Sequence, residues 1–300
     1  MTIHWVGTGL SAIPGLRRLL AGDTPVAVWN RTVDKAREAV GDLTGDIRTY
    51  SLPALTGAVA AGDVVVSMLP ADQHPALARM CVEKRAHFVS SSYISPEMAA
   101  LEQAAVDAGV ALVNEVGLDP GIDHLMAHEL VADYRQCAQK GDRISFTSYC
   151  GGIPKHPNPF RYKFSWSPLG VLRALRSPSR SIRGGEERVV ERPWHAIEPY
   201  DAPLSVPERF EVYPNRDSTA FIDQYNFDRD WTLQDFVRGT IRLKGWSEAW
   251  SEVFAEVEGL VGPEGDVRLR EMAEGFWDQH AYAEGEPDRV VLLVRLAAER

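Results

Sequence analysis

The sequence predicts an α/β protein in which a doubly wound parallel sheet is followed by an α+β domain with an open mixed sheet. Three observations predict this fold class. An apolar run at residues 3–6 leads into a glycine-rich turn, apolar runs and helical patterns then alternate to about residue 113, and this alternation ends beyond about residue 124. We therefore expect a first domain over residues 1–124 and a second domain over residues 125–300.

The glycine turn after the first predicted strand is typical of a dinucleotide-binding βαβ unit. Gly7 permits a tight turn, and Gly9 lets the backbone approach a pyrophosphate closely. Leu10 and Ser11 complete the turn, and apolar residues then recur at helical spacing over residues 13–20. Because the free N–H groups of such a helix face an anion, we predict a Rossmann-type cofactor domain. The alternative is an ordinary glycine turn.

The end of the second predicted strand, residues 26–29, indicates which nicotinamide cofactor binds. An NAD-dependent enzyme usually carries Asp or Glu there to bond the ribose 2′-hydroxyl. This chain carries Asn30, Arg31 and Thr32 instead, and a guanidinium can pair with a 2′-phosphate. We therefore predict NADP(H) rather than NAD(H). The alternative is that Arg31 and Thr32 merely begin a helix over residues 33–40, with Thr32 as its N-cap.

The rest of the first domain continues the alternation. Short apolar runs predict three more strands, at residues 64–69, 87–90 and 111–113. Helical patterns predict helices over residues 75–83 and 96–108. Ligands of such folds bind at the carboxyl ends of the strands, where the loops 70–74, 90–95 and 114–121 fall. We expect Leu69, Pro70 and Ser91 in this region to contact the cofactor.

The second domain is predicted from weaker patterns. A helix is expected over residues 122–139, a half-exposed strand over 144–150, helical segments over 247–260 and a strand over 290–296. Six arginines between residues 173 and 192 resemble a nucleic-acid patch. Glutamates are interspersed among them, however, and this mixture favours a solvated hairpin.

Composition and charge exclude several classes of protein. No apolar stretch reaches about 18 residues and no cationic leader precedes an apolar core, so we expect no membrane association, no secretory signal and a cytoplasmic location. The net charge of -10 opposes general binding to nucleic acid. The three cysteines have no CxxC spacing, so they predict neither a disulfide framework nor a zinc site.

Four blocks of sequence carry a family resemblance. The blocks are residues 91–96, residues 114–124, residues 148–152 with 162–167, and residues 213–218. On these blocks the chain resembles the saccharopine reductase family, the NADP-dependent, glutamate-forming saccharopine dehydrogenases, over most of residues 3–245.

The resemblance implies a reaction. Glutamate and 2-aminoadipate 6-semialdehyde condense to an imine, and NADPH reduces the imine to saccharopine, or the reverse reaction runs, in lysine metabolism. The protein must then orient a small amino-acid substrate, bind three carboxylates and manage protons. We also expect a homodimer. The alternatives are a related imine reductase for a polyamine-derived or other substrate, a lysine-oxidising relative, and a non-catalytic NADPH-binding protein.

Three residues are candidates for catalysis. The Tyr93 hydroxyl could relay a proton or bond the substrate, and the Asp119 carboxylate could stabilise an iminium cation or act as general base. Their structural alternatives are a packing tyrosine and a turn-forming aspartate; the resemblance favours function for both. It also places Cys150 in the active site as a substrate contact or minor acid–base group. Asp119, Asp123 and His124 lack further ligands, so no metal site is expected.

Four residues are candidates for substrate binding. Arg216 lies in a turn-forming sequence, and its guanidinium can hold a carboxylate at two points together with the neighbouring Asn215. The alternative for Arg216 is a salt bridge to Asp217 or Asp223. Lys163 and Trp166 are expected to add charge and an apolar wall to the pocket, although a buried core tryptophan is the alternative at position 166.

Overall fold

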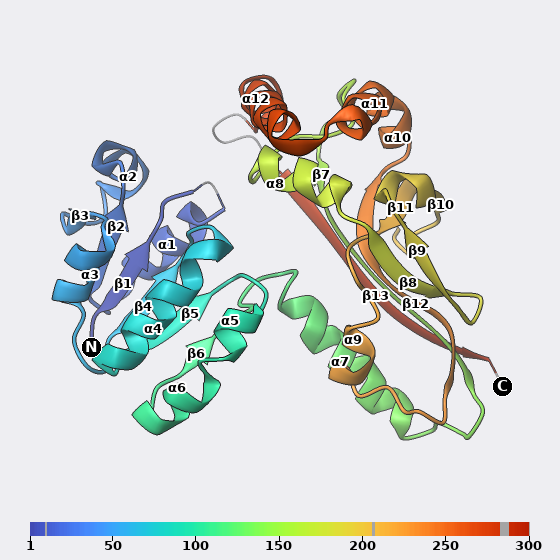
Figure 1. Ribbon diagram of the computed structural model, residues 1–300, viewed down its shortest axis with the longest axis horizontal. Helices are drawn as coiled ribbons and strands as arrows, with labels where there is room; N and C mark the ends of the chain where they lie inside the picture. The colour runs from blue at the N-terminus through green and yellow to red at the C-terminus, as the bar shows by residue number, and fades with distance from the viewer. Residues whose placement is uncertain (10, 206–207, 283–287, 300) are drawn as a thin grey trace. The chain divides into compact units, whose positions relative to one another are not determined.

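The computed structural model describes residues 1–9, 11–205, 208–282 and 288–299. Contacts divide the chain into two units, Met1–Ile122 and Asp123–Arg300, and each is described by itself. Figure 1 shows the elements of both units. None of the helices in the described ranges combines the length and the apolar character that crossing a membrane requires.

The first unit is built on a six-stranded parallel sheet with the strand order β3-β2-β1-β4-β5-β6. The strands are β1 Ile3–Val6, β2 Val26–Asn30, β3 Ile47–Thr49, β4 Val64–Ser67, β5 His87–Ser90 and β6 Leu112–Val113. This is the Rossmann order, in which the winding direction reverses between β1 and β4. The predicted doubly wound parallel sheet is therefore confirmed.

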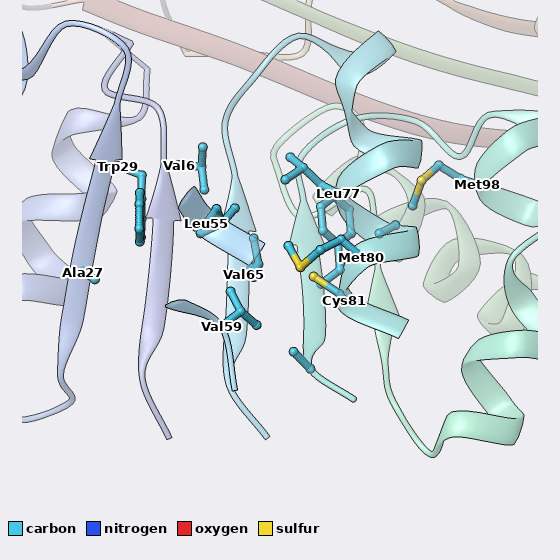
Figure 2. Close-up of a cluster of buried hydrophobic side chains, with 13 residues drawn as sticks. Val6, Ala27, Trp29, Leu55, Val59, Val65, Leu77, Met80, Cys81 and Met98 are labelled. Atoms are coloured by element: carbon cyan, nitrogen blue, oxygen red, sulfur yellow. The ribbon is translucent and has the colours of Figure 1, made fainter. Parts of the chain in front are cut away.

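Helices cover both faces of this sheet. They are α1 Ile13–Leu20, α2 Val33–Val40, α3 Leu52–Ala58, η1 Ala71–Gln73, α4 His74–Lys84, α5 Pro96–Ala99 and α6 Glu102–Ala108. Val66 of β4 packs in a cluster with α1 and α2, whereas its neighbour Val65 packs in a cluster with α3 and α4. Figure 2 shows the second cluster, in which Leu55, Leu77 and Met80 lie against the strands.

One predicted helix of this unit is divided in two. Residues 96–108 form α5 and α6 because the Leu101 N–H bonds the Met98 carbonyl, three residues back, instead of continuing the α-helical pattern. Ser95 caps α5 as expected, its hydroxyl accepting from the Met98 N–H (3.2 Å).

A buried polar network in the same sheet connects β1 and β2 with Asp63, the residue before β4. The indole N–H of Trp29 can only donate, and it donates to His4 Nδ1 (3.1 Å), so the His4 proton lies on Nε2 and points at Asp63 (3.3 Å). The Asp63 carboxylate also accepts from the N–H groups of Thr2 (2.7 Å) and Ala60 (2.9 Å). Burial raises the pKa of Asp63, but the hydrogen bonds from Thr2, Ala60 and His4 together lower it by more. The net pKa of Asp63 therefore lies below its ordinary value.

The second unit contains a seven-stranded sheet with the order β10-β11-β12-β7-β13, to which β8 and β9 are added beside β12. The strands are β7 Arg143–Pro154, β8 Ser179–Arg183, β9 Glu186–Val190, β10 Glu198–Tyr200, β11 Phe210–Pro214, β12 Thr232–Leu243 and β13 Asp288–Glu299. The pair β12–β7 is parallel and the other pairs are antiparallel, as expected of a mixed sheet. The predicted hairpin is β8–β9, and its turn is Gly184-Gly185 with φ +62° and +82°.

The helices of the second unit are α7 Ile122–Arg135, which begins in the first unit, α8 Pro168–Arg176, η2 Pro193–Ala196, α9 Phe221–Gln224, α10 Trp246–Ala249, α11 Ser251–Gly259 and α12 Gly262–His280. The helix expected over 122–139 ends at Arg135, because the N–H groups of Gln136 and Cys137 bond only three residues back.

One face of this sheet carries a band of polar side chains between two apolar clusters. Along β12, Phe236 packs in the cluster under α7 and α9, while Trp246, beyond the strand, packs in the cluster under α8, α11 and α12. Figure 1 shows these two groups of helices at opposite ends of β7 and β12. We call the residues between them the polar band: Ser148, Cys150, Arg238, Thr240 and Arg242. They share one face because side chains alternate along a strand.

Candidate active site

A glycine turn at the carboxyl end of β1 begins the candidate cofactor site. Gly7 adopts φ +103°, and a Cβ at this position would lie 3.2 Å from the Met68 carbonyl oxygen. The Gly7 N–H donates to the Trp29 carbonyl (2.8 Å), and the Trp5 indole donates to the Gly7 carbonyl (2.9 Å). The backbone conformation therefore requires glycine here, and the close approach of the Met68 carbonyl favours it as well.

Three features of this turn fit a bound pyrophosphate. Thr8 Oγ1 is buried and has no hydrogen-bond partner among the described residues. Ala12, the N-cap of α1, has no side chain that could accept from the first N–H groups of the helix. A Cβ at Gly9 would meet no atom of the described chain within 4 Å, so packing does not demand glycine there, whereas close approach of a ligand would. Ser11 is exposed beside the turn, and Leu10, also predicted to contact the cofactor, lies outside the described residues.

The local structure at the end of β2 leaves the guanidinium of Arg31 exposed. The Asn30 side-chain amide donates to the Thr32 carbonyl (2.7 Å) and so shapes the turn into α2. Thr32 is the N-cap of α2, but its hydroxyl makes no capping hydrogen bond. Arg31 is exposed and forms no ion pair within the described part of the chain. The local fold therefore uses Asn30 but neither the Arg31 guanidinium nor the Thr32 hydroxyl.

The remaining predicted cofactor contacts follow β4 and β5. The Leu69 N–H donates to Ser67 Oγ (3.4 Å), and the Leu69 carbonyl accepts from His74 Nε2 (3.0 Å). Burial lowers the pKa of His74, and the hydrogen bond to the Leu69 carbonyl opposes part of this effect. Pro70 is exposed, and Ser91 is half-buried. The described cofactor candidates thus lie at the carboxyl ends of β2, β1, β4 and β5, which are consecutive in the sheet.

Two loops bring Tyr93 and Asp119 together. The Tyr93 hydroxyl donates to Asp119 Oδ1 (2.7 Å) although 26 residues separate them. The loops are joined by a hydrogen bond from the Glu115 N–H to the Ser92 carbonyl (3.1 Å) and by one from the Ile94 N–H to Glu115 Oε1 (3.2 Å). The two residues predicted to be catalytic in the first unit therefore form one pair.

The loop that carries Asp119 folds back on itself. Gly121 adopts φ +144°, and a Cβ there would lie only 2.3 Å from the Gly117 carbonyl oxygen. Glycine is required at position 121 for this return, which leaves Asp119 exposed. A phenol bonded to an exposed carboxylate can hold or pass a proton, and the carboxylate can stabilise a nearby cation.

Cys150 belongs to the polar band of the second unit. It pairs with Thr240 of β12, and Thr240 pairs in turn with Tyr213 of β11, so the three residues form a row across the sheet. Cys150 is half-buried rather than sealed in the core. Because Tyr213 lies two residues before Asn215, this row connects Cys150 to the segment predicted to bind substrate.

The segment of Asn215 and Arg216 is anchored by β12 and by β8. The Asn215 N–H donates to the Arg238 carbonyl (3.0 Å), and the Arg180 N–H donates to the Arg216 carbonyl (2.8 Å). Arg216 adopts φ +55°, an uncommon conformation for a residue with a side chain, and it is exposed. Asp217, one alternative partner for Arg216, accepts from the Thr219 N–H (2.9 Å) and hydroxyl (2.6 Å).

Lys163 and Trp166 lie in the segment before α8. The Lys163 ammonium is 5.6 Å from the ring centroid of Tyr282. Trp166 is 47% exposed, which excludes a buried core tryptophan. A Cβ at Gly170 would be 2.5 Å from the Trp166 ring, so the indole packs closely against α8. Burial raises the pKa of Tyr162, and a hydrogen bond with Trp166 opposes this effect.

An ion pair at the start of α7 is not predicted from the sequence. Asp123 Oδ2 lies 2.5 Å from Arg238 Nη2, and both side chains are buried. His124 Nδ1 lies 2.7 Å from the Tyr225 hydroxyl. Within the described ranges, no group of three or more His, Cys, Asp or Glu side chains is placed to hold a metal ion.

Arg242 was also missed. It is buried in the polar band beside aromatic rings, four residues after Arg238 on the same strand face. One signal in the sequence could have found both arginines. They alternate with the apolar residues Val237 and Ile241 along a strand, and this pattern places them on one face with Thr240.

Comparison with known proteins gives matches over both units. Residues 3–113 match the family model described as the saccharopine dehydrogenase NADP binding domain, and residues 117–299 match the saccharopine dehydrogenase C-terminal domain. A Saccharomyces cerevisiae saccharopine dehydrogenase (NADP⁺, L-glutamate-forming) is 38% identical over 254 residues, which cover 81% of this chain and 55% of the yeast protein. Mouse mitochondrial alpha-aminoadipic semialdehyde synthase is 38% identical over 232 residues, which cover 75% of this chain and 24% of the mouse protein.

The chain thus spans about half the length of its fungal relatives and about a quarter of the mouse relative. Among solved structures, the apo S. cerevisiae saccharopine dehydrogenase (L-Glu forming) matches with a TM-score of 0.77 and 26% identity, covering 99% of this chain and 84% of the yeast chain. A Legionella pneumophila homospermidine synthase in complex with NAD matches with a TM-score of 0.56 at 10% identity, which shows a shared fold only.

Proposed function

The chain belongs to the saccharopine dehydrogenase family, and on that premise we propose that it is an NADP(H)-dependent oxidoreductase acting on the CH–NH bond of saccharopine. In one direction the imine of glutamate and 2-aminoadipate 6-semialdehyde gains a hydride and a proton to give saccharopine. In the other direction saccharopine loses both, and water cleaves the imine to glutamate and the aldehyde. The observation that carries the proposal is that the two family models match in order over residues 3–113 and 117–299.

Residues of the first unit hold the cofactor, which supplies the hydride when bound. Gly7, Gly9 and Ser11, just before α1, bind the pyrophosphate. The Thr8 hydroxyl, which is buried without a partner among the described residues, supports this assignment. Arg31, with Asn30 and Thr32 beside it, binds the adenosine 2′-phosphate through charge-assisted hydrogen bonds. Leu69, Pro70 and Ser91 line the part of the site that follows β4 and β5.

Tyr93 and Asp119 manage charge and protons. The imine is reduced more readily once its nitrogen is protonated, and the Asp119 carboxylate stabilises the resulting iminium cation. The Tyr93 hydroxyl, which donates to Asp119 Oδ1 at 2.7 Å, orients that carboxylate and can pass a proton to or from the substrate nitrogen. Cys150 contacts the substrate without forming a covalent bond, because hydride transfer needs no nucleophile.

Residues of the second unit bind the substrate. Saccharopine carries three carboxylates, whereas the chain has a net charge of -10, so local cations must attract it. Arg216 holds one carboxylate at two points, with Asn215 beside it. Lys163 adds a positive charge, and the exposed indole of Trp166 provides an apolar wall.

Two further parts of the proposal concern assembly and location. We propose that the chain is a homodimer, which light scattering would show as a mass near twice 33.3 kDa. A single-chain mass at concentrations that support activity would reject the dimer. We also propose that it acts in the cytoplasm, and recovery of the native protein in another cell fraction would reject that location.

The proposal is tested by NADP⁺ reduction with saccharopine, lysine and carboxyspermidine measured side by side. We expect turnover with saccharopine far above that with the other two amines. Turnover mainly with carboxyspermidine would identify a related imine reductase, and turnover mainly with lysine would identify a lysine-oxidising relative. NADPH binding without turnover of any amine would identify a non-catalytic relative, so each of these outcomes would reject the proposal.

A further inference from the structure

We propose that Ser218 is a positioning residue whose hydroxyl holds Arg216 in the orientation that receives a substrate carboxylate. The inference rests on the proposed function and deepens it, because it names the contact that prepares Arg216 for binding. Ser218 is fully buried, and the reaction proposed for the site does not use its hydroxyl.

The first argument is the place where β11 leaves β12. Their pairing ends at Pro214 and Gly239. A regular antiparallel ladder would continue with two hydrogen bonds exchanged between Asn215 and Arg238. One of them forms, from the Asn215 N–H to the Arg238 carbonyl (3.0 Å). The Arg238 N–H donates instead to Ser218 Oγ (2.9 Å), and the Ser218 hydroxyl donates to the Arg238 carbonyl (3.2 Å). The Ser218 side chain thus replaces a backbone partner where the chain turns away from β12.

The second argument is that β8 holds the same turn from its other side. The Arg180 N–H donates to the Arg216 carbonyl (2.8 Å), and the Ser218 N–H donates to the Arg180 carbonyl (2.8 Å). Ser218 therefore bonds β12 through its hydroxyl and β8 through its backbone. Together with the hydrogen bond from Asn215 to Arg238, these contacts fix the chain before and after Arg216.

The third argument is that Arg238 is itself held in place. Its guanidinium lies 2.5 Å from Asp123 Oδ2, and its central carbon lies 3.9 Å from the ring centroid of Phe221. The Phe221 N–H donates in turn to the Ser218 carbonyl (3.1 Å). Arg238 is only 7% exposed, so its backbone N–H needs a partner within the protein. The Ser218 hydroxyl is therefore bonded to a fixed and buried part of the sheet.

The consequence concerns how Arg216 meets its ligand. Arg216 adopts φ +55°, which a residue with a side chain keeps only when its surroundings hold it there. Its side chain is exposed, and ordering a long exposed side chain on binding costs conformational entropy. A turn held by Ser218 presents the guanidinium from one backbone direction and so lowers this cost. Without the hydroxyl, the turn can relax and the two-point contact with a carboxylate weakens.

The experiment is a double-mutant cycle. It compares the wild type, Ser218→Ala, Arg216→Ala and the variant that carries both substitutions. Ser179→Ala is the matched control, because Ser179 is also a buried serine, lies beside Arg180, and has a hydroxyl without a hydrogen-bond partner among the described residues. We measure kcat and KM for saccharopine, the Kd for NADPH, and the Kd for saccharopine by calorimetry in the presence of NADPH, which cannot accept a hydride from it.

Ser218→Ala is expected to raise the KM and the Kd for saccharopine about fivefold, with a smaller effect on kcat and an unchanged Kd for NADPH. In the Arg216→Ala background the same substitution should change both constants less than about twofold, because the residue that it positions is gone. Ser179→Ala should keep the wild-type constants. An unchanged affinity for saccharopine in Ser218→Ala, or the same loss in both backgrounds, would show a merely structural role and overturn the inference.

A second variant and a measurement on the wild type cover the case in which Ser218→Ala does not fold. Ser218→Cys nearly keeps the volume of the side chain but weakens both of its hydrogen bonds, so the same cycle with Ser218→Cys should show the same dependence on Arg216. Hydrogen exchange of the wild type should find the N–H groups of Asn215, Ser218 and Arg238 protected as strongly as other amides of β12. Exchange of these three groups at the rate of an open loop would overturn the inference.

The two proposals fail in different ways. If saccharopine binds with the expected coupling between Ser218 and Arg216 but is not oxidised, the proposed function fails and the positioning role stands. If saccharopine is oxidised but the two substitutions act independently, only this inference fails.

Discussion

Replacing Arg31 by Asp should remove the preference of the chain for NADPH over NADH. Arg31 follows β2, is exposed and forms no ion pair within the described residues, so its guanidinium is available for a phosphate. A hydrogen bond between charged groups contributes about 1.5–3 kcal/mol, and every 1.4 kcal/mol corresponds to about tenfold in Kd. Because solvent screens an exposed site, we take the lower half of that range and expect the Kd for NADPH to rise about 10- to 50-fold.

The same substitution should leave NADH binding equal or improved, because a carboxylate at this position can accept from the ribose 2′-hydroxyl. Calorimetric titrations with both cofactors at one fixed ionic strength measure the two Kd values. Arg37→Asp is the matched control, since it makes the same change of charge on α2, where Arg37 pairs with Asp34 at 3.0 Å. An equal loss of affinity for NADPH and NADH in Arg31→Asp would refute the assignment of the 2′-phosphate site.

Three further predictions concern the catalytic pair, the substrate site and stability. Asp119→Asn keeps an acceptor for Tyr93 but removes the charge, so kcat should fall about 100-fold while the Kd for NADPH is unchanged; an unaltered kcat would reject the role of the charge. Arg216→Ala should raise the KM for saccharopine about tenfold with a smaller effect on kcat, and an unchanged KM would count against it. Asp63→Asn should lower the free energy of unfolding in urea by about 1–3 kcal/mol at neutral pH. Because the folded pKa of Asp63 is lowered, this stabilisation is present above about pH 4 and is lost as the pH falls through the folded pKa. The difference in unfolding free energy between Asp63→Asn and the wild type should therefore shrink in acid. Asp23→Asn, at an exposed position, is the control, and a pH-independent difference for Asp63→Asn would contradict the account.

The first unit was predictable because its signals are local. A strand, a glycine turn and a helix follow one another within residues 3–20. The carboxyl ends of parallel strands all lie at one edge of the sheet, so the loops that follow them form the ligand site. The short strand β3 was not predicted, since Ile47 is its only large apolar residue. The split of residues 96–108 into α5 and α6 depends on one shifted hydrogen bond at Leu101, which composition does not reveal.

The second unit was less predictable because its order depends on contacts between distant residues. The helix α12 was missed, since Gly262, Pro263 and two further glycines interrupt its helical pattern although its buried face packs against α8. Arg238 and Arg242 come to lie beside Ser148 and Cys150 only through strand pairing. The Arg238–Asp123 contact, for example, joins residues 115 positions apart. Family blocks located Cys150 and Arg216, but only the register of β11, β12 and β7 connects them.

The central claim is that this chain delivers a hydride from NADPH to a carbon–nitrogen double bond. The most direct test supplies NADPH carrying deuterium at its transferring position, together with glutamate and 2-aminoadipate 6-semialdehyde, and analyses the products by mass spectrometry. We predict saccharopine with one deuterium on the carbon that was the aldehyde carbon. Deuterium found only in the alcohol formed from the free aldehyde, or in no product, would contradict the account.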